Sequence, residues 1–345
     1  MIFIDGAEGE GGGQVLRTAL ALSIVTGQPF RIEKIRAGRK RPGLMRQHVT
    51  AVEAACTIGG AECGELAVGA TEISFAPRAL APGAIAPGEH EFAIGTAGSA
   101  SLVLQTVLPA LLLADRPSRL VLSGGTHNPS APPFEFLDRA FLPLLRRMGA
   151  DVEARLERPG FYPAGGGRIL VEVRPAGRLQ PLELVDRGPL RRTEARALIA
   201  ALPGEIAARE LAVVGKVLGW PEEARRIDQL ADRVGPGNVL LLEAQFERVT
   251  EIVAGFGRIG ISAERVGEQA AKRMRGFLDS AAAVGPYLAD QLLLPLALAG
   301  GGRFTTVKPS LHSRTAAGVI ERFLEVAITF SERDDGCHLA AVRGG

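Results

Sequence analysis

The stretch Gln14-Val-Leu-Arg-Thr-Ala-Leu-Ala-Leu, residues 14–22, decides the fold, because similar stretches occur twice more in the 345-residue chain. They are Gln105-Thr-Val-Leu-Pro-Ala-Leu-Leu-Leu and Gln291-Leu-Leu-Leu-Pro-Leu-Ala-Leu-Ala. Each places a glutamine at the head of an apolar helical run, and a glycine or proline and then strand-like residues follow. Second helices are expected to begin near Pro42, Pro132 and Ser310. The predicted unit is therefore strand, helix, strand, helix, strand, used three times, the alternative being chance recurrence of apolar helices that begin with glutamine.

This repeat predicts an α/β fold in which helices cover one face of each sheet. Residues 186–278 do not match the repeat and are interpreted as an inserted small α/β domain, while residues 1–185 and 279–345 form the large domain. Within the insert we expect a helix around 195–201, a helix at 203–218, a turn at 235–238, strands at 239–243 and 250–254, and a helix at 262–279. The apolar stretch 102–114 is too short for a bilayer and contains Gln105 and Pro109, so a buried helix is predicted.

Composition and charge indicate a globular chain, with 46% hydrophobic and 23% charged residues and a net charge of +2. So small a net charge excludes a binder that relies on overall basicity, and any anionic partner must be held by a local cluster of cations. Cys56, Cys63 and Cys337 are odd in number and form no C-x-x-C pair, so neither a disulfide framework nor a zinc site is indicated. The acidic start of the chain does not resemble a secretory signal, and a soluble, cytoplasmic protein without a membrane anchor is expected.

A glycine-rich turn, Asp5-Gly-Ala-Glu-Gly-Glu-Gly-Gly-Gly-Gln, could bring backbone amides close to a phosphate at a helix start. It matches neither the dinucleotide fingerprint nor the P-loop. Its acids would repel a bare phosphate, but Glu10 could help to hold a divalent ion that the phosphate also binds. Taken alone, the turn is better interpreted as a tight turn with solvated acids.

Cations without a compensating acid gather between Lys34 and Val52, which predicts a local anion site. They are Lys34, Arg36, Arg39, Lys40, Arg41 and Arg46, and Gln47 and His48 come directly after them. The alternative is a solvated basic loop.

His312 stands at the expected start of a helix, beside Ser310. A neutral imidazole nitrogen is a competent nucleophile toward phosphorus, and a helix N-terminus lowers the pKa of a nearby histidine. A lone histidine is more often structural, and His90, His127 and His338 are interpreted in that way.

A second candidate segment, Val284-Gly-Pro-Tyr-Leu-Ala-Asp-Gln, places polar and aromatic groups at a helix start. Tyr287 could stack on a purine while Asp290 and Gln291 reach its hydrogen-bonding edges, and Gln105 holds the equivalent position in the second repeat. A helix cap with a core tyrosine is equally consistent with these residues.

Several long motifs in the same order resemble the RNA 3′-terminal phosphate cyclase family, nearly from end to end. The motifs are the glycine-rich turn at 5–17, Ile35-Arg-Ala-Gly-Arg, Pro42-Gly-Leu-Met-Arg-Gln-His, Gly95-Thr-Ala-Gly-Ser, Gly160-Phe-Tyr-Pro-Ala-Gly-Gly-Gly, Gly235-Pro-Gly-Asn, Tyr287-Leu-Ala-Asp-Gln and the His312 segment. The resemblance implies a large domain of three repeats related to enolpyruvyl transferases, with an inserted domain of thioredoxin-like arrangement.

The same resemblance implies a reaction and its residues. Members with the active-site histidine attack the α-phosphate of ATP, pass AMP to an RNA 3′-phosphate, and let the vicinal 2′-hydroxyl displace AMP. His312 would be the nucleophile and Glu10 a ligand of Mg²⁺ or Mn²⁺. The ATP site would comprise Gln105, Tyr287, Leu288, Ala289, Asp290 and Gln291. The RNA end or the reacting phosphates would be bound by Arg17, Arg36, Arg39, Gln47 and His48.

One departure and two alternatives accompany this resemblance. Many members have Thr-Asn shortly after the histidine, whereas this chain has Thr315-Ala316, which leaves any role of that asparagine in doubt. A ribosome-biogenesis branch of the family lacks the catalytic histidine, and His312 argues against it. An enolpyruvyl transferase shares only the architecture, which is weak support for function.

Overall fold

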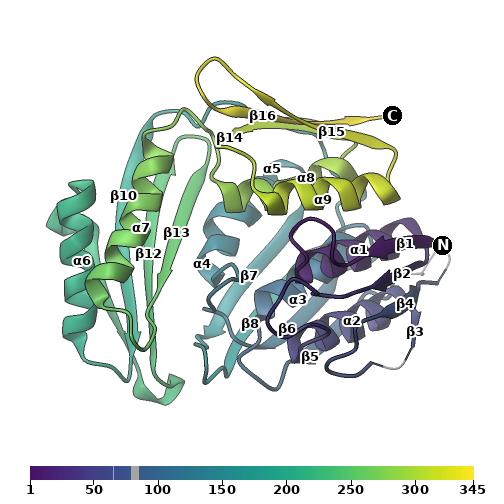
Figure 1. Ribbon diagram of the computed structural model, residues 1–345, viewed down its shortest axis with the longest axis horizontal. Helices are drawn as coiled ribbons and strands as arrows, with labels where there is room; N and C mark the ends of the chain where they lie inside the picture. The colour runs from purple at the N-terminus through teal and green to yellow at the C-terminus, as the bar shows by residue number, and fades with distance from the viewer. Residues whose placement is uncertain (65, 79–84) are drawn as a thin grey trace.

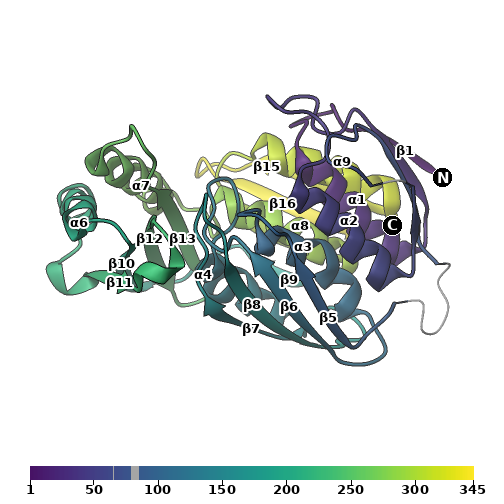
Figure 2. The same ribbon diagram turned by 90° about the horizontal axis from the view of Figure 1, so that it is seen from below.

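The computed structural model describes residues 1–64, 66–78 and 85–345 of the chain. These residues form a mixed α/β structure with four sheets of four strands each. Helices fill the centre of the larger part of the molecule and the sheets lie outside them, while the fourth sheet and its two helices stand to one side (Figures 1 and 2). The expectation of an α/β fold is confirmed.

Three of the sheets share one topology. In each, the first two strands along the chain pair in parallel. The fourth strand pairs antiparallel with the second, and the third strand lies at the edge, antiparallel to the fourth. The first sheet comprises β1 (Ile2–Asp5), β2 (Phe30–Glu33), β4 (Ile73–Ala76) and β3 (Glu62–Cys63). The second comprises β5 (Glu89–Ala93), β6 (Ser118–Gly124), β8 (Gly167–Arg174) and β7 (Asp151–Arg158), and the third β9 (Leu182–Leu184), β14 (Gly301–Thr306), β16 (His338–Gly344) and β15 (Val326–Glu332). Each sheet therefore has one strand more than the predicted unit.

The helices that begin near the three glutamines lie in the middle of the molecule. They are α1 (Gly13–Thr26), α3 (Ala100–Leu112) and α8 (Pro286–Leu298), and α1 packs against α3 as well as against α2 (Arg46–Gly59) and α9 (Leu311–Phe323). Twelve of the thirteen residues of α3 are buried, so the prediction of a buried helix at 102–114 is confirmed. In the part of the chain that is described, no helix is both long and apolar enough to cross a membrane.

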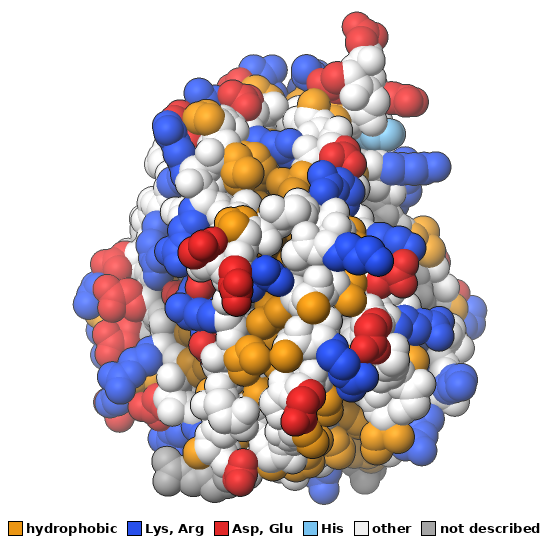
Figure 3. Space-filling model, turned by 90° about the vertical axis from the view of Figure 1, so that its left-hand side faces the viewer, with side chains coloured by type: hydrophobic (Ala, Val, Ile, Leu, Met, Phe, Trp, Pro, Cys, Tyr) orange, Lys and Arg blue, Asp and Glu red, His pale blue; other side chains and the backbone are white. Residues whose placement is uncertain are grey.

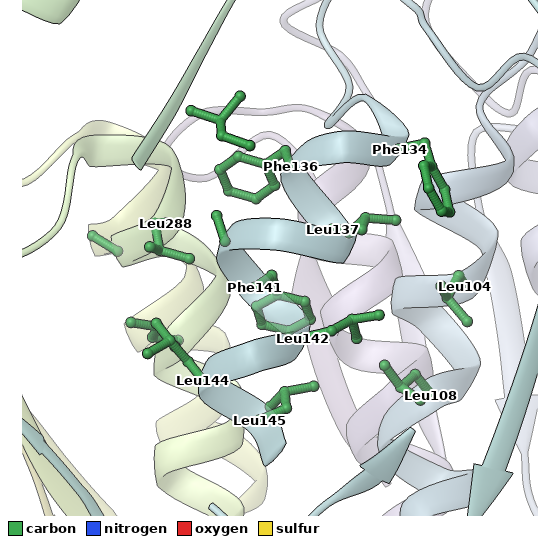
Figure 4. Close-up of a cluster of buried hydrophobic side chains, with 14 of the residues drawn as sticks. Leu104, Leu108, Phe134, Phe136, Leu137, Phe141, Leu142, Leu144, Leu145 and Leu288 are labelled. Atoms are coloured by element: carbon green, nitrogen blue, oxygen red, sulfur yellow. The ribbon is translucent and has the colours of Figure 1, made fainter. Parts of the chain in front are cut away.

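A short helical segment made of α4 (Phe134–Phe136), η1 (Leu137–Phe141) and α5 (Leu142–Arg147) packs between α3 and α8. Its middle turn is a π-helix, and Pro143 follows directly. Because proline has no N–H to donate to the carbonyl four residues earlier, a regular helical ladder is interrupted here. The turn brings Phe136 and Phe141 toward Leu288 of α8 in one apolar cluster (Figure 4).

The β10–β13 unit, residues 190–278, carries the fourth sheet in the order β11-β10-β12-β13. It consists of β10 (Leu190–Ala200), α6 (Gly204–Leu218), β11 (Arg225–Leu230), β12 (Gly237–Phe246), β13 (Thr250–Phe256) and α7 (Ala263–Leu278). The predicted helices at 203–218 and 262–279 and the predicted strands at 239–243 and 250–254 are confirmed. The division of the chain into domains at 185/186 and 278/279 stays a prediction, as does the likeness to enolpyruvyl transferases and thioredoxin.

The helix predicted around 195–201 is wrong, because these residues belong to strand β10. Ala195, Ala197 and Ala200 favour helices in isolation, but β10 is flanked by β11 on one side and β12 on the other. Residues 197–200 of this strand are buried, whereas several residues earlier in the strand are partly exposed. A continuous buried run is typical of a central strand, so tertiary pairing overrides the local preference.

A buried carboxylate joins the β10–β13 unit to the start of α8. Glu251 on β13 is 1% exposed, and its Oε2 accepts a hydrogen bond from the backbone N–H of Gly285 at 2.8 Å. Burial raises the pKa of Glu251 from 4.5 to about 7, while Gly285 and Arg187 act in the opposite direction. Since the folded-state pKa lies above the unfolded value, the contribution of Glu251 to stability is complete below pH 4.5 and is lost as pH rises through 7.

We therefore expect Glu251→Gln to keep the hydrogen bond to Gly285 and to remove this pH dependence. The gain in the free energy of unfolding over wild type should be small near pH 5 and approach about 3 kcal/mol at about pH 9. Denaturant unfolding across this range measures it, with Glu53→Gln at an exposed site of α2 as control. A gain that does not vary with pH would contradict the assignment.

Candidate functional site

A cavity of about 710 Å³ is lined by residues of α1, α3, α8 and α9, and by β13 and α7 of the β10–β13 unit. Seven of the predicted site residues line it: Arg17, Arg39, Gln105, Tyr287, Asp290, Gln291 and His312. Helix N-termini present unpaired amides and a positive dipole end, which favours anions. The cavity therefore combines residues from both ends of the chain, with four arginines among many apolar side chains.

Gln14, Gln105 and Gln291 all line this cavity. Gln14 is the second residue of α1, whereas Gln105 and Gln291 lie one turn further in, each as the sixth residue of its helix. The amide of Gln105 donates a hydrogen bond to Oε1 of Gln291. Oε1 of Gln14 lies 2.8 Å from Nδ1 of His312, although the two residues are 298 positions apart in sequence. Sequence reasoning used Gln14 only to define the repeat and missed it as a site residue. Its position matched that of Gln105, and this was the signal that could have found it.

His312 is the second residue of α9, and Ser310 caps this helix by accepting a hydrogen bond from the Ser313 N–H at 3.0 Å. When Nδ1 of His312 carries the proton and donates to Gln14, Nε2 keeps its lone pair. Partial burial lowers the pKa of His312, and Arg39 and Arg17 lower it further against the opposing effect of Asp290. The imidazole is therefore neutral at pH 7 and above.

Asp290 was predicted to contact a purine, and in the structure its carboxylate accepts hydrogen bonds from two serines at the start of α9. Its Oδ1 accepts a hydrogen bond from the Ser310 hydroxyl at 2.9 Å and another from the Ser313 hydroxyl. Burial raises its pKa, and the two serines oppose that effect. Asp290 thus fastens the first turn of α9, which carries His312, to α8, which carries Tyr287. The Tyr287 ring remains 52% exposed on the cavity wall.

Glu10 lies at the tip of the glycine-rich turn, close to His312. Its Oε1 forms an ion pair with Arg39 and lies 3.5 Å from Nε2 of His312, whereas its buried Oε2 has no hydrogen-bond partner among the described residues. The backbone N–H of Glu10 donates to the Thr315 hydroxyl at 3.0 Å, which ties the turn to α9. Ala316, the departure from the family pattern, is buried and lines the cavity.

The orphaned oxygen of Glu10 fits a hard divalent cation, because Mg²⁺ prefers oxygen ligands and often uses one carboxylate together with substrate phosphates. Across residues 1–64, 66–78 and 85–345, no group of three or more His, Cys, Asp or Glu side chains is arranged to hold an ion. Any ion here would thus take most of its ligands from phosphates and water.

A candidate anion site lies beside the start of α1. Arg17 is enclosed by protein except where it lines the cavity, and it makes no ion pair with any described residue. Burial lowers its pKa to about 10 with a further contribution from Arg36, so it stays charged at neutral pH. His48 is buried, and burial together with Arg17 and Arg36 lowers its pKa to about 3. A Cβ at Gly13 would overlap His48 Nε2, so glycine is required there.

His48 is a neutral hydrogen-bond donor in this site. Its Nδ1 accepts a hydrogen bond from the Met45 N–H at 3.0 Å, which places the proton on Nε2. Arg17 and His48 therefore present donors to one point, and both suit a phosphate oxygen.

Six predicted residues do not line the cavity: Glu10 and His48, described above, and Arg36, Gln47, Leu288 and Ala289. Arg36 donates to the carbonyl oxygens of Arg41 at 2.8 Å and Gly43 at 2.7 Å, and so holds the basic loop. Gln47 accepts a hydrogen bond from the Ser99 N–H at 3.1 Å. Leu288 and Ala289 are buried, and the side chain of Leu288 points into the apolar cluster of Figure 4. Their predicted contacts to substrates stay predictions.

The far wall of the cavity comes from the β10–β13 unit, which sequence reasoning left without a role in the site. The wall includes Phe256, Arg258, Ile261, Gln269 and Arg273. Nothing in the sequence pattern of residues 250–273 signals that they face a site, since the contact depends on how the unit packs against the rest of the chain.

The chain matches the family model described as "RNA 3′-terminal phosphate cyclase" over residues 8–330. The chain belongs to the RNA 3′-terminal phosphate cyclase family. It is 54% identical over 344 residues to the RNA 3′-terminal phosphate cyclase of Ectopseudomonas mendocina, a match that covers 100% of this chain and 98% of that protein. It is 52% identical over 340 residues to the protein of the same name from Koribacter versatilis, with 99% and 94% covered. The protein of that name from Salmonella enteritidis is 49% identical over 336 residues, with 97% of both chains covered. The recognition made from the motifs is thereby confirmed.

Because Arg17 is held without a counter-charge, we expect Arg17→Met to weaken anion binding without destabilising the fold. Pyrophosphate should raise the melting temperature of the wild type. Its affinity for the variant should be lower by up to about tenfold. Thermal unfolding with and without pyrophosphate measures both effects, and Arg116→Met at an exposed site is the control. A marked loss of stability with unchanged pyrophosphate binding would contradict the anion site.

Proposed function

We propose that this chain is an ATP-dependent cyclase that converts the 3′-terminal phosphate of RNA into a 2′,3′-cyclic phosphate through a covalent AMP adduct on Nε2 of His312. Family membership supports the overall reaction. The observation that carries the adduct is His312 itself: its Nδ1 is engaged by Gln14, its pKa is lowered, and it lines a cavity together with four arginines and the exposed Tyr287.

In the first step, the lone pair of His312 Nε2 attacks the α-phosphorus of ATP. A P–N bond forms, the bond from the α-phosphorus to the bridging oxygen breaks, and pyrophosphate leaves. As Nε2 bonds to phosphorus, the imidazole becomes cationic, and Gln14 Oε1 stabilises the proton on Nδ1. Arg17 and Arg39 compensate charge that develops on the phosphate oxygens.

In the second step, an oxygen of the RNA 3′-phosphate attacks the same phosphorus, the P–N bond breaks, and His312 returns as neutral imidazole. The RNA then carries a 3′-diphosphate linked to adenosine. In the third step, the neighbouring 2′-hydroxyl loses its proton and attacks the 3′-phosphorus, and AMP leaves. Because the hydroxyl is already next to the phosphorus, the protein has little to do beyond positioning.

The remaining residues have supporting roles in this proposal. Tyr287 offers an exposed ring to the adenine, and the linked amides of Gln105 and Gln291 offer hydrogen bonds nearby. Arg17 and His48 suit the RNA 3′-phosphate. A divalent ion held by Glu10 would supply charge neutralisation for the leaving pyrophosphate.

The histidine-lacking ribosomal branch is not favoured, because His312 is present and lies in the cavity. An enolpyruvyl transferase has no support beyond architecture, since the relatives described above are named RNA 3′-terminal phosphate cyclases.

Incubation with ATP and Mg²⁺ should give an acid-labile, alkali-stable protein–AMP adduct, which His312→Ala abolishes because no other nitrogen holds the same position. Labelled ATP and intact-mass measurement detect the adduct. His90→Ala, a partly buried histidine of β5 outside the cavity lining, should keep it. An adduct that persists in His312→Ala would remove the assignment.

Gln14→Ala should slow adduct formation by about 10- to 100-fold, because Nδ1 loses the acceptor that fixes its proton. Gln14→Glu should retain adduct formation, since a carboxylate accepts the same hydrogen bond. It should also move the acidic limb of the rate to higher pH, because the added negative charge raises the pKa of His312. The pH dependence of the single-turnover rate measures both effects. Identical profiles for wild type and Gln14→Glu would contradict this role.

A further inference from the structure

An exposed aromatic ring stands outside the cavity, on the loop of residues 159–166 between β7 and β8. The chain has two tyrosines, and both are more than half exposed: Tyr287 at 52% and Tyr162 at 66%. Tyr287 lines the cavity, whereas Tyr162 has no part in the reaction proposed above. Because the ring of Tyr162 is not buried by the protein, it is free to stack on a ligand with a flat face.

The backbone that carries Tyr162 is firmly anchored. Phe161 is buried and stacks on His127 with 5.2 Å between ring centroids, and His127 Nε2 lies 2.8 Å from Glu135 Oε2. The Gly165 N–H donates to the Phe161 carbonyl oxygen at 2.6 Å. A base that stacks on Tyr162 would therefore not have to order the loop first, which lowers the entropic cost of binding.

A second loop, residues 95–99, connects this position with the anion site. Gln47, the neighbour of His48, accepts a hydrogen bond from the Ser99 N–H, and a Cβ at Gly98 would stand 2.9 Å from the Gln47 Cβ. On the other side, a Cβ at Gly165 would stand 3.0 Å from the Ala97 Cα. The chain of contacts runs from His48 to the Tyr162 loop through segments of small residues.

The surface along this path is open. Gly95 and Gly166 face open space, since a Cβ at either would meet no atom within 4 Å. Backbone without side chains allows a ribose-phosphate chain to approach closely. Arg158 is exposed, and its Nε donates to the Gly166 carbonyl oxygen, which leaves the outer nitrogens for a phosphodiester. By contrast, the face of the β10–β13 unit seen in Figure 3 mixes acidic and basic side chains, with no continuous basic stripe among the side chains that are described.

We propose that the loops at 95–99 and 159–166 carry the single-stranded RNA that leads to the 3′-phosphate, with Tyr162 stacking on one of its bases. This inference rests on the proposed function, since it needs the terminal phosphate at Arg17 and His48. Single-stranded RNA is the class that fits, because its unstacked bases are free to pair with an aromatic ring while its phosphates follow cations. Stacking does not depend strongly on base identity, so the site accepts varied sequences.

The test compares 3′-phosphorylated oligoribonucleotides of two and of six nucleotides as substrates. Tyr162→Ala should raise KM for the hexanucleotide about tenfold with little change in kcat. It should leave KM for the dinucleotide unchanged, because the stacked base is placed upstream of the two terminal nucleotides. Tyr162→Phe keeps the ring and should restore the wild-type KM. Phe3→Ala removes an aromatic ring of similar exposure, 70%, on β1, and should have no effect on either substrate.

The rate of adduct formation from ATP without RNA distinguishes failure of the proposed function from failure of the proposed RNA path. If the wild type forms no adduct, the proposed function fails. If adduct formation is intact and Tyr162→Ala leaves KM for the hexanucleotide unchanged, the RNA path fails. An equal rise of KM for both lengths would overturn it as well, because that result indicates a general disturbance of the site.

Discussion

The hydrogen bond between His312 Nδ1 and Gln14 Oε1 is the contact on which the rest of the site depends. It joins the first and last of the three similar sheet-and-helix units, so it exists only when α1 and α9 pack side by side. Asp290 on α8 and the backbone N–H of Glu10, which donates to Thr315, fix the same end of α9 from two further directions. An imidazole supported in this way presents one defined nitrogen to the cavity, which is the condition for nucleophilic attack at phosphorus.

The site contains charged groups that are not fully neutralised by other described residues, and these groups prepare it electrostatically for its ligands. Arg17 has no counter-charge in the described structure, and burial, together with Arg17 and Arg36, lowers the pKa of His48 and keeps it neutral. Such groups are unfavourable for folding and favourable for binding an anion, because the ligand supplies the missing charge. Glu10 has the opposite sign and an unpaired buried oxygen, so cation and phosphate are expected at adjoining positions.

Much of this could be predicted from the sequence, since the repeated glutamine-headed helices and the ordered motifs are local patterns. His312, Tyr287 and Arg17 were identified in this way, and they do line one cavity. The helix around 195–201 was wrong because an alanine-rich segment was judged without its flanking strands. Gln14 as a partner of His312 and the wall formed by Arg258 could not be deduced, because both arise from contacts between distant segments.

The most direct test of the account is to identify the nitrogen that bonds to phosphorus. Nuclear magnetic resonance of the AMP adduct, on protein labelled with heavy nitrogen in histidine, reveals the site through phosphorus–nitrogen coupling. We expect coupling to Nε2 of His312, with Nδ1 still protonated and hydrogen-bonded. Coupling to Nδ1, or to a nitrogen of another residue, would contradict it.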